Sequence, residues 1–169
     1  SRVDGKALGT FGTFGVYSFQ QTKNVSCGEG GALLINHAAF AERAERLRDK
    51  GTNRQDMERG LVSSYEWVEP GGGLGLSELC SAVLRGQFEE ADAVKRGRRH
   101  VFDRYTERLT SLEKSDDIKL IRPVEGTDHN AHLFAFLARD RDVRDRILSY
   151  LNDRKIGAAF HFMPLHASI

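Results

Sequence analysis

The stretch SFQQTKN at residues 18–24, followed by CGEGG at residues 27–31, is the most informative part of this sequence. Lys23 lies there after a short apolar segment and just before a glycine-rich turn. A lysine amine bonds covalently to an aldehyde once desolvation or neighbouring cations lower its pKa. Ser18 offers a hydroxyl that can donate a hydrogen bond to a phosphate. The pair therefore suits a cofactor that carries both an aldehyde and a phosphate.

Pyridoxal phosphate has both groups, and its flat ring needs close approach by the backbone. Gly28, Gly30 and Gly31 permit such an approach because they carry no side chain. The same residues also suit a surface lysine in an ordinary turn, since a serine and a lysine near glycines occur in many proteins. Chemistry and spacing alone leave these two interpretations open.

The composition bounds the class of protein. The chain has 169 residues, 40% of them hydrophobic and 29% charged, so it is the size of one domain or of a piece of a larger one. Lys plus Arg number 25 against 24 Asp plus Glu, so we expect neither nucleic acid nor an anionic membrane surface as partner. The sequence has no 18-residue apolar run, so no transmembrane helix is expected.

The cysteines and the two ends of the sequence indicate the cellular compartment and whether the sequence is part of a longer protein. Cys27 and Cys80 are too few for a disulfide framework, which favours the cytoplasm. Residues 1–10 lack the apolar segment of a secretory signal. The chain opens without Met and ends at Ile169 without a stop pattern, so we expect a fragment of a longer protein.

Turn residues and apolar spacing predict the elements of the first half. A short strand is expected at residues 16–19, and a buried one at Ala32–Ile35. Asn36 is placed to cap a helix over residues 37–50, with Gly51 at its C-terminal end. The segment that follows has no clear period, and its interpretation is more open.

Residues 51–76 predict a long loop, with a hairpin around Tyr65–Val68 as an option. The run Gly71–Gly73 favours a mobile loop. Ser77 then begins one long or kinked helix that reaches about Leu112. Its first part is apolar almost all round and is expected to be buried. Its later part is amphipathic and is expected to cross between two domains.

The tail alternates strand and helix. Strands are predicted at Ile118–Ile121, at Ala131–Ala138 as a central strand, and at Ile156–Phe162. Asp140 is placed to cap a helix between the second and third of these strands. The tail is therefore expected to form a small α+β unit.

Several motifs recur in a fixed order. GTFGVYSF at residues 12–19 precedes Lys23-Asn24 and GEGGA at residues 28–32. Later come, in order, KGTNR at 50–54, LSEL at 76–79, NAHLF at 130–134 and FHFMPLH at 160–166. This combination resembles the DegT/DnrJ/StrS aminotransferases, pyridoxal-phosphate enzymes that aminate nucleotide-linked keto-sugars. It looks most like the sub-family that makes dTDP-4-amino-4,6-dideoxygalactose, and it covers essentially the whole chain.

The resemblance implies an α/β fold, part of an aspartate-aminotransferase-like (fold type I) transferase. Residues 1–90 would complete the large cofactor domain, and residues 91–169 would form a small C-terminal domain. Lys23 would bind pyridoxal 5'-phosphate and move the proton, and Ser18 would hold its phosphate. A dTDP-linked 4-keto-6-deoxy sugar is the implied substrate, glutamate the usual amino donor, and a homodimer the implied assembly.

Two departures from the family limit the carry-over. The family's upstream half supplies an Asp for the pyridinium nitrogen, a stacking aromatic residue and a phosphate loop, and none of these precedes Lys23 here. The chain alone is therefore not expected to catalyse. Many members have an Asn where this chain has Gly73, so no phosphate contact is carried over to that position.

Other polar residues have competing interpretations. Asn53 and Arg54 suit contact with a sugar nucleotide, since Arg binds diphosphate bidentately, but a solvated loop pair is equally consistent. His161 lies near the family's sugar-facing end strand, and the resemblance implies a substrate contact. Residues 95–99 are expected to form a solvated basic helix face. The histidines lack convergent ligands, so no metal site is expected.

Two rival functions stay open at this point. In one, the chain is a member of the family that binds a sugar nucleotide or a partner without catalysis. In the other, it is an unrelated α/β binding module. The missing strands would leave an apolar face, so we also expect the isolated chain to aggregate or associate.

Overall fold

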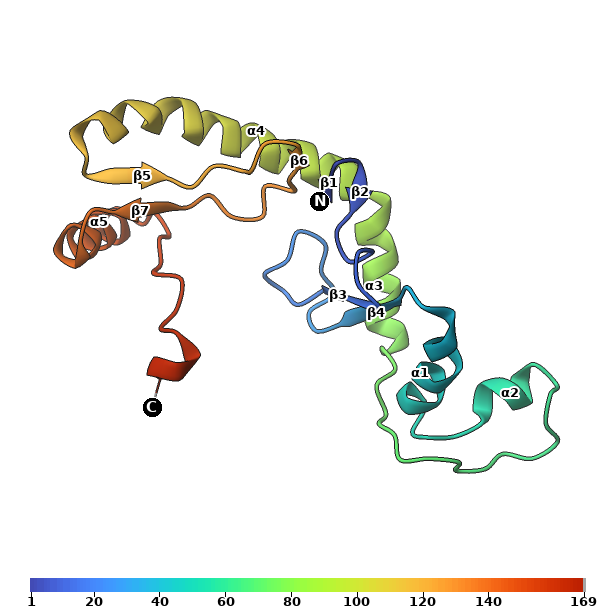
Figure 1. Cartoon of the computed structure of the whole chain (residues 1–169). Coiled ribbons are helices and arrows are strands. Elements are labelled where there is room, and N and C mark those ends of the chain that lie inside the picture. Colours follow the sequence, from blue (N-terminus) through green and yellow to red (C-terminus); the bar gives the residue numbers. More distant parts are fainter. Residues whose placement is uncertain (169) are drawn as a thin grey trace. The chain divides into compact units, whose positions relative to one another are not determined.

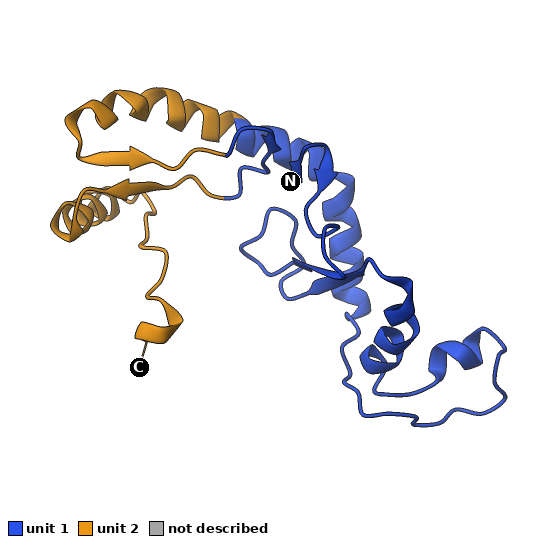
Figure 2. Cartoon of the chain, viewed as in Figure 1, with its two compact units in different colours: residues 1–99, 124–132 blue, residues 100–123, 133–169 orange. Residues whose placement is uncertain are grey.

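The computed structural model describes residues 1–168 and contains two compact units (Figure 1, Figure 2). Unit 1 comprises Ser1–Arg99 with Val124–His132, and unit 2 comprises His100–Pro123 with the chain from Leu133 onward. Helices and strands are mixed in both units, as the predicted α/β class requires. The expected division into domains near residue 90 stays a prediction.

An antiparallel hairpin encloses the lysine-bearing segment. β3 (Phe14–Ser18) pairs with β4 (Gly31–Ile35), so that Ser18 lies opposite Gly31 (Figure 1). Both predicted strands are confirmed, although the first ends one residue earlier than expected. The pairing brings the two ends of residues 19–30 together, and we call residues 19–30 the lysine turn.

The helix after β4 begins later than predicted. The 3-10 helix η1 (Ala38–Phe40) precedes α1 (Ala41–Arg48). Asn36 does not cap either helix, because its Nδ2 donates to the carbonyls of Gly9 and Gly12 at 2.9 and 2.8 Å. The capping prediction was wrong because this amide finds its acceptors in a separate loop, which local spacing does not reveal.

Residues 51–76 are more regular than predicted. The short helix α2 (Arg54–Glu58) lies within them. The optional hairpin is absent from this segment, where isolated antiparallel bridges pair Thr52 with Trp67 and Gly73 with Asp49. Thr52 is almost completely buried, so the loop closes over its own start.

Close backbone contacts fix the end of α1 against the glycine run. Gly51 has a φ of +75°, and a Cβ on it would lie 1.7 Å from the Glu69 carbonyl oxygen. The Lys50 N–H donates to the Gly72 carbonyl at 3.0 Å, and the Gly72 N–H donates to the Leu47 carbonyl at 2.8 Å. The run is thus held against α1, which corrects the expectation of a mobile loop.

The stretch predicted as one long or kinked helix forms two successive helices with one residue between them. α3 (Glu78–Glu89) and α4 (Ala91–Leu109) are separated at Glu90 (Figure 1). The Ser77 hydroxyl accepts a hydrogen bond from the Cys80 N–H at 3.2 Å, so the predicted N-cap is confirmed.

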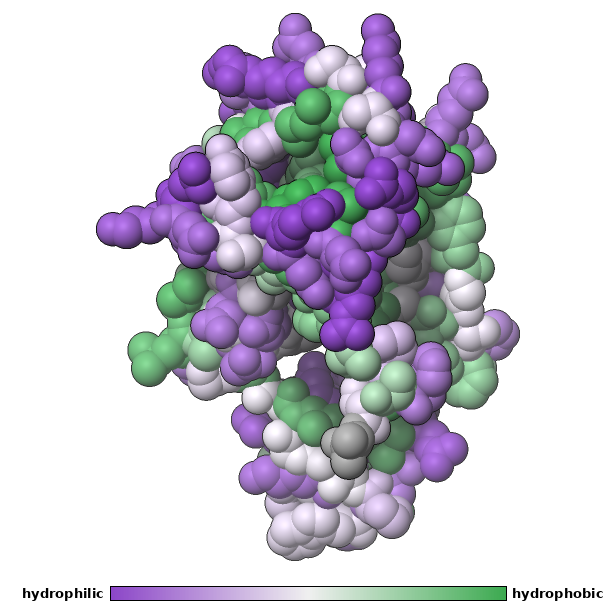
Figure 3. Space-filling view, turned by 90° about the vertical axis from the view of Figure 1, so that its left-hand side faces the viewer, coloured by the Kyte–Doolittle hydropathy of each residue, from purple (hydrophilic) through white to green (hydrophobic). Residues whose placement is uncertain are grey.

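Apolar side chains of α3 and of the hairpin lie on the surface. Leu79 of α3 is 82% exposed, and Val83 and Phe88 are also exposed. Val16 of β3 and Leu33 of β4 are exposed as well. Figure 3 shows apolar patches among hydrophilic side chains on the face of the molecule that it presents. The predicted burial of α3 and β4 was therefore wrong, because nothing within residues 1–168 covers these faces.

Unit 2 contains a strand pair and a helix. β5 (Ile118–Leu120) pairs antiparallel with β7 (Phe136–Ala138), and α5 (Arg141–Asp153) follows. Asp140 caps α5 as predicted, since its Oδ1 accepts from the Val143 N–H at 2.8 Å. The 3-10 helices of this region are η2 (Thr110–Ser115) and η3 (Leu165–Ala167). Its buried apolar side chains are Phe102, Ile118, Leu120 and Val143.

Two strand predictions in the tail were wrong. Of the expected central strand at residues 131–138, only β7 is a strand, and within the described chain β5 is its one neighbour. Ala131 has a φ of +50°, which is incompatible with an extended strand. Residues 156–162 form no strand. Both predictions rested on apolar content alone, and apolar content does not distinguish a strand from the irregular backbone that these segments form.

A small sheet in unit 1 was not predicted. β1 (Arg2–Val3) lies between β2 (Lys6–Ala7) and β6 (Thr127–Asp128), and both pairings are antiparallel. Two-residue strands are too short to give a periodic signal. This sheet anchors residues 124–132 to the beginning of the chain.

Candidate functional site

The lysine turn has an ordered backbone. The Lys23 N–H donates to the Gln20 carbonyl at 2.9 Å. The Cys27 N–H donates to the Phe19 carbonyl at 3.0 Å, and the Phe19 N–H donates to the Gly30 carbonyl at 2.8 Å. These bonds cross the base of the turn, so Lys23 stands half-buried on a closed loop and not on a free one.

Ser18 marks the edge of the lysine turn. It is the last residue of β3, it is exposed, and its Oγ accepts weakly from the Gln20 N–H at 3.4 Å. Its hydroxyl proton therefore remains available to a phosphate oxygen. The structure thus brings Ser18 to the base of the same turn that carries Lys23, and the cofactor roles of both residues stay predictions.

Cys27 fills the inside of the turn. Its thiol is buried and lies 3.8 Å from the Phe19 carbonyl and 3.4 Å from the Glu29 carbonyl. A Cβ on Gly30 would lie 2.7 Å from the Cys27 Sγ, so Gly30 is needed for this packing. Burial raises the pKa of the Cys27 thiol, which favours the protonated and less nucleophilic form.

Asn24 connects the turn to a distant segment. Its Nδ2 donates to the Asn130 carbonyl at 2.7 Å, and its Oδ1 lies 2.9 Å from Nδ1 of His132. Sequence reasoning missed this contact, although Lys23-Asn24 and Asn130–His132 both stand in the ordered motifs. Only the fold joins positions more than 100 residues apart.

Asn53 and Arg54 lie at the start of α2. The Asn53 side chain is 8% exposed; its Nδ2 donates to the Ser64 carbonyl at 3.0 Å and its Oδ1 accepts from the Glu66 N–H at 2.8 Å. Arg54 is exposed and donates to Glu58 at 2.8 Å, a contact that raises the pKa of its guanidinium. Within residues 1–168, neither residue forms a hydrogen bond or an ion pair with the lysine turn. Their substrate role stays a prediction.

His161 belongs to unit 2. It is exposed, and its ring stacks on Phe162 with centroids 4.2 Å apart and an interplanar angle of 29°. Phe162 has a φ of +66°. The predicted substrate contact of His161 remains untested by this arrangement.

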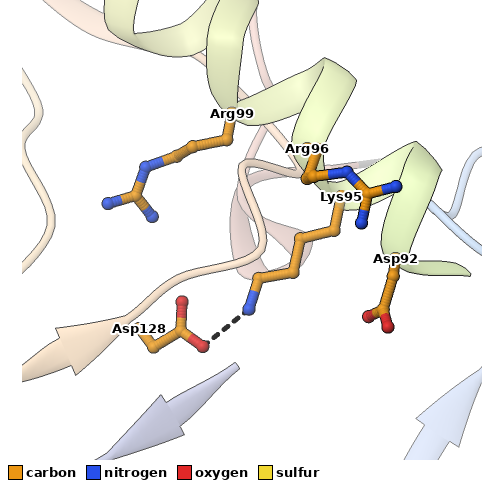
Figure 4. Close-up of a pocket in the computed structure, with 5 residues that line it drawn as sticks. All are labelled: Asp92, Lys95, Arg96, Arg99 and Asp128. Carbon is orange, nitrogen blue, oxygen red and sulfur yellow. Dashed lines mark hydrogen bonds and ion pairs between the residues drawn. The ribbon is translucent and has the colours of Figure 1, made fainter.

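A polar hollow of about 510 Å³ lies beside α4 (Figure 4). Asp92, Lys95, Arg96, Arg99 and Asp128 line it. Lys95 reaches to Asp128, with Nζ 2.6 Å from Oδ2, and this bond lowers the pKa of the Asp128 carboxyl. Two carboxylates among three cations leave little net charge for a further anion.

The basic stretch of α4 does more than face solvent. Arg98 donates to the His132 carbonyl and Arg99 to the His129 carbonyl, both at 3.3 Å. The expectation of a solvated face was therefore wrong for these two side chains, because the 124–132 segment folds back onto the helix. Within the described residues, no group of three or more His, Cys, Asp or Glu side chains is placed to hold a metal ion.

A lysine on a hairpin-closed turn in an α/β chain is the arrangement expected of pyridoxal-phosphate transferases of fold type I. The chain belongs to the DegT/DnrJ/EryC1/StrS aminotransferase family, whose sequence model matches residues 1–168. The predicted family and fold class are confirmed. Membership also indicates pyridoxal phosphate as the cofactor.

Solved structures and a curated relative support this placement. The aminotransferase TlmJ from Streptoalloteichus hindustanus matches 98% of this chain with 42% of its own, at a TM-score of 0.84 and 28% identity. DesV from S. venezuelae matches 99% of this chain with 42% of its own, at a TM-score of 0.79 and 29% identity. GDP-perosamine synthase from Escherichia coli O157:H7 is 24% identical over 168 residues, which are 98% of this chain and 42% of that protein. The chain thus spans less than half the length of these relatives.

The residues present fit one side of the cofactor. Lys23 offers an amine on a closed turn, and Ser18 offers an exposed hydroxyl at its base. The neutral thiol of Cys27 is packed inside the turn and does not compete for the aldehyde. An amine and a hydroxyl donor match the aldehyde and the phosphate of pyridoxal phosphate.

Proposed function

We propose that this chain is the lysine-bearing part of a pyridoxal-phosphate-dependent sugar-nucleotide aminotransferase, with Lys23 as its catalytic residue. The observation that carries the proposal is the position of Lys23 on a turn closed by β3 and β4, with Ser18 at its base. The proposed substrate is a dTDP-linked 4-keto-6-deoxy sugar, and the proposed amino donor is glutamate. The relative named GDP-perosamine synthase supports a nucleotide-linked sugar as the substrate. Its name contains GDP and not dTDP, so the nucleotide has to be identified by experiment.

Ser18 and Lys23 divide the work in this proposal. The Ser18 hydroxyl donates its proton to a phosphate oxygen of the cofactor. The Lys23 amine holds the cofactor at its aldehyde carbon. Once an incoming amine had displaced it, the freed Lys23 amine would carry a proton between the two carbons that flank the nitrogen, the aldehyde carbon of the cofactor and the sugar carbon that bears nitrogen. Bound pyridoxal phosphate supplies an electron sink for that proton transfer.

Substrate recognition is proposed for three further residues. The exposed guanidinium of Arg54 suits a diphosphate, which it can bind through two N–H groups. Both the Nδ2 and the Oδ1 of Asn53 are hydrogen-bonded within its own loop. We propose that Asn53 holds Arg54 in position, and that it contacts the substrate itself only when these two bonds break. His161 is proposed to contact the sugar.

The setting of the protein is also proposed. We infer a homodimer in the cytoplasm, with no nucleic acid or membrane as partner. The free cysteines Cys27 and Cys80 are consistent with a reducing compartment. Within the described residues, every helix is too short or too polar to cross a bilayer.

A visible absorbance spectrum with added pyridoxal phosphate tests the proposal. The complete product of the gene should develop the band of lysine-bound cofactor, and its Lys23→Ala variant should lose that band. Lys119→Ala is the matched control, because Lys119 is an exposed lysine on β5 and has no part in the proposed site. Borohydride reduction followed by peptide mapping should place the cofactor on Lys23.

The alternative is a protein of the same fold that binds a sugar nucleotide or a partner without catalysis. It would show saturable binding of dTDP-sugar by calorimetry but no visible band with pyridoxal phosphate. Equal bands in the wild type and in Lys23→Ala would contradict the assignment of Lys23.

A further inference from the structure

Two side chains of the lysine turn reach outside the hairpin: the Phe19 ring packs on Phe88 of α3 with centroids 5.5 Å apart, and Asn24 forms hydrogen bonds to a distant segment. The Gln20 amide oxygen accepts from the N–H and the hydroxyl of Thr22 at 2.9 and 2.6 Å, which fixes only neighbouring residues. Among the hydrogen bonds that the described residues make from positions 19–30, only those of the Asn24 side chain reach beyond the hairpin. Local bonds therefore set the shape of the turn, whereas Asn24 ties it to a fixed point elsewhere in unit 1.

The orientation of the Asn24 amide follows from its partners. The Asn130 carbonyl can only accept, so the atom 2.7 Å from it is the donor Nδ2. The Asn24 Oδ1 then faces His132 at 2.9 Å and can only accept. Nδ1 of His132 must therefore carry a proton, because two acceptors at this distance would repel.

The segment that receives Asn24 is a strained, ordered turn. Ala131 is buried and has a φ of +50°, a conformation that costs an L-residue free energy. Its N–H donates to Nδ1 of His129 at 3.2 Å, and the His132 N–H donates to Oδ1 of Asn130 at 3.3 Å. Such a conformation persists only where the surroundings hold it, so this turn offers a rigid point of attachment.

Helix α4 and the chain start supply that support. Arg98 and Arg99 donate to the carbonyls of His132 and His129, each at 3.3 Å. The Ser1 hydroxyl accepts from the Asn130 N–H at 3.1 Å. The turn at 129–132 is thus held from two directions, and any group bonded to it shares its fixed position.

We propose that Asn24 is a positioning residue for Lys23, acting through its two bonds to the 129–132 turn. We call these two bonds the latch; with the latch closed, the lysine turn and the Lys23 amine it carries keep one position relative to the 129–132 turn. Without it, the lysine turn keeps its internal bonds but swings about the hairpin end. Where it concerns the cofactor, this inference rests on the function proposed above.

Two measurements on the complete gene product test the latch. Hydrogen exchange reports the Lys23 and Cys27 amides without any cofactor, and the growth of the visible band reports capture of pyridoxal phosphate by Lys23. Asn24→Ala removes both bonds. It should speed amide hydrogen exchange in residues 20–28 about tenfold and slow the capture of pyridoxal phosphate about tenfold. A tenfold change is about what the loss of one hydrogen bond produces.

Two further variants sharpen the test. Asn24→Asp keeps an acceptor for His132 but sets an oxygen against the Asn130 carbonyl, so its effects should lie between those of the wild type and Asn24→Ala. Asn36→Ala is the matched control, since the Asn36 amide likewise makes two hydrogen bonds to a separate segment, to the Gly9 and Gly12 carbonyls, but at the opposite end of the hairpin. It should leave both readouts of the lysine turn unchanged.

The outcomes separate the two proposals. Unchanged exchange and unchanged capture in Asn24→Ala would overturn the latch while leaving Lys23 as the cofactor lysine. Faster exchange in Asn24→Ala, with no cofactor band even in the wild type, would support the latch and count against the aminotransferase function. Equal changes in Asn24→Ala and Asn36→Ala would show a general loosening of the hairpin and would overturn the positioning role.

Discussion

Asn53 and Asn24 each fasten a loop with both ends of a side-chain amide, but their partners differ. Asn53 is almost fully buried and bonds to residues 64 and 66, so it closes the loop in which it stands. Asn24 is half-buried and bonds to residues 130 and 132, so it joins its loop to another. The first kind of contact fixes a loop internally, whereas the second fixes the loop that carries Lys23 relative to another segment.

The largest loss of stability is expected from a substitution at Gly51, two residues before Asn53. Gly51 and Gly60 have nearly the same φ, +75° and +74°, but only Gly51 has a carbonyl in the place of a Cβ. Gly51→Ala should lower the free energy of unfolding by about 3–4 kcal/mol, and Gly60→Ala by about 1–2 kcal/mol from the backbone conformation alone. Urea unfolding of both variants measures this difference. Equal losses would show that the Glu69 contact yields easily.

The Asn53 amide should come next. Asn53→Ala leaves the Glu66 N–H and the Ser64 carbonyl without their partner, so we expect a loss of about 2–3 kcal/mol in the free energy of unfolding. The same urea experiment measures it. A loss below that of Gly60→Ala would mean that water replaces the amide readily, and the loop would then not depend on this residue.

Asn24 should matter less for stability than Asn53 does. Because its amide is only half-buried, water can take its place, and Asn24→Ala should cost about 1 kcal/mol. Unfolding curves of the two asparagine variants, recorded side by side, test this order. If Asn24→Ala proved more destabilising than Asn53→Ala, this would contradict the contrast between Asn53, which bonds within its own loop, and Asn24, which bonds to another segment.

The smallest effect concerns a charged clamp in unit 2. Glu113 accepts from Arg122 and from the Leu120 N–H, which lowers the pKa of its carboxyl from 4.5 to about 2. Because the folded-state pKa is the lower one, the stabilisation is complete above pH 4.5 and is lost as the pH falls towards 2. The stability difference between the wild type and Glu113→Gln should therefore shrink between pH 5 and about pH 2. A difference that stays constant over this range would show that the clamp is not formed in solution.

Local signals gave reliable predictions. The caps at Ser77 and Asp140 were found because each side chain bonds to a backbone N–H three residues ahead. The strands β3 and β4 were predicted because short apolar runs lie beside glycines, although their pairing as a hairpin was not predicted. The lysine and serine of the candidate site could also be named from their motif, although the chemistry alone left them ambiguous.

The failures share a different cause. Asn36 and Asn24 bond to residues that are distant in the sequence, so no local pattern could place their amides. The apolar segment from Ala131 looked like a central strand, but the backbone turns at Ala131 and extends only near β7. The exposure of Leu79 could not be predicted, since apolar composition implies burial without naming what covers it.

The register of the hairpin has a consequence for how this protein can vary. With Ser18 held opposite Gly31, the ends of the lysine turn stay at the spacing of neighbouring strands. Exchanges at its exposed positions Gln21, Thr22 and Glu29 would therefore change the surroundings of Lys23 without disturbing the buried Phe19 and Cys27. Substitutions at these positions can therefore be screened for changes in the reactivity of the Lys23 amine.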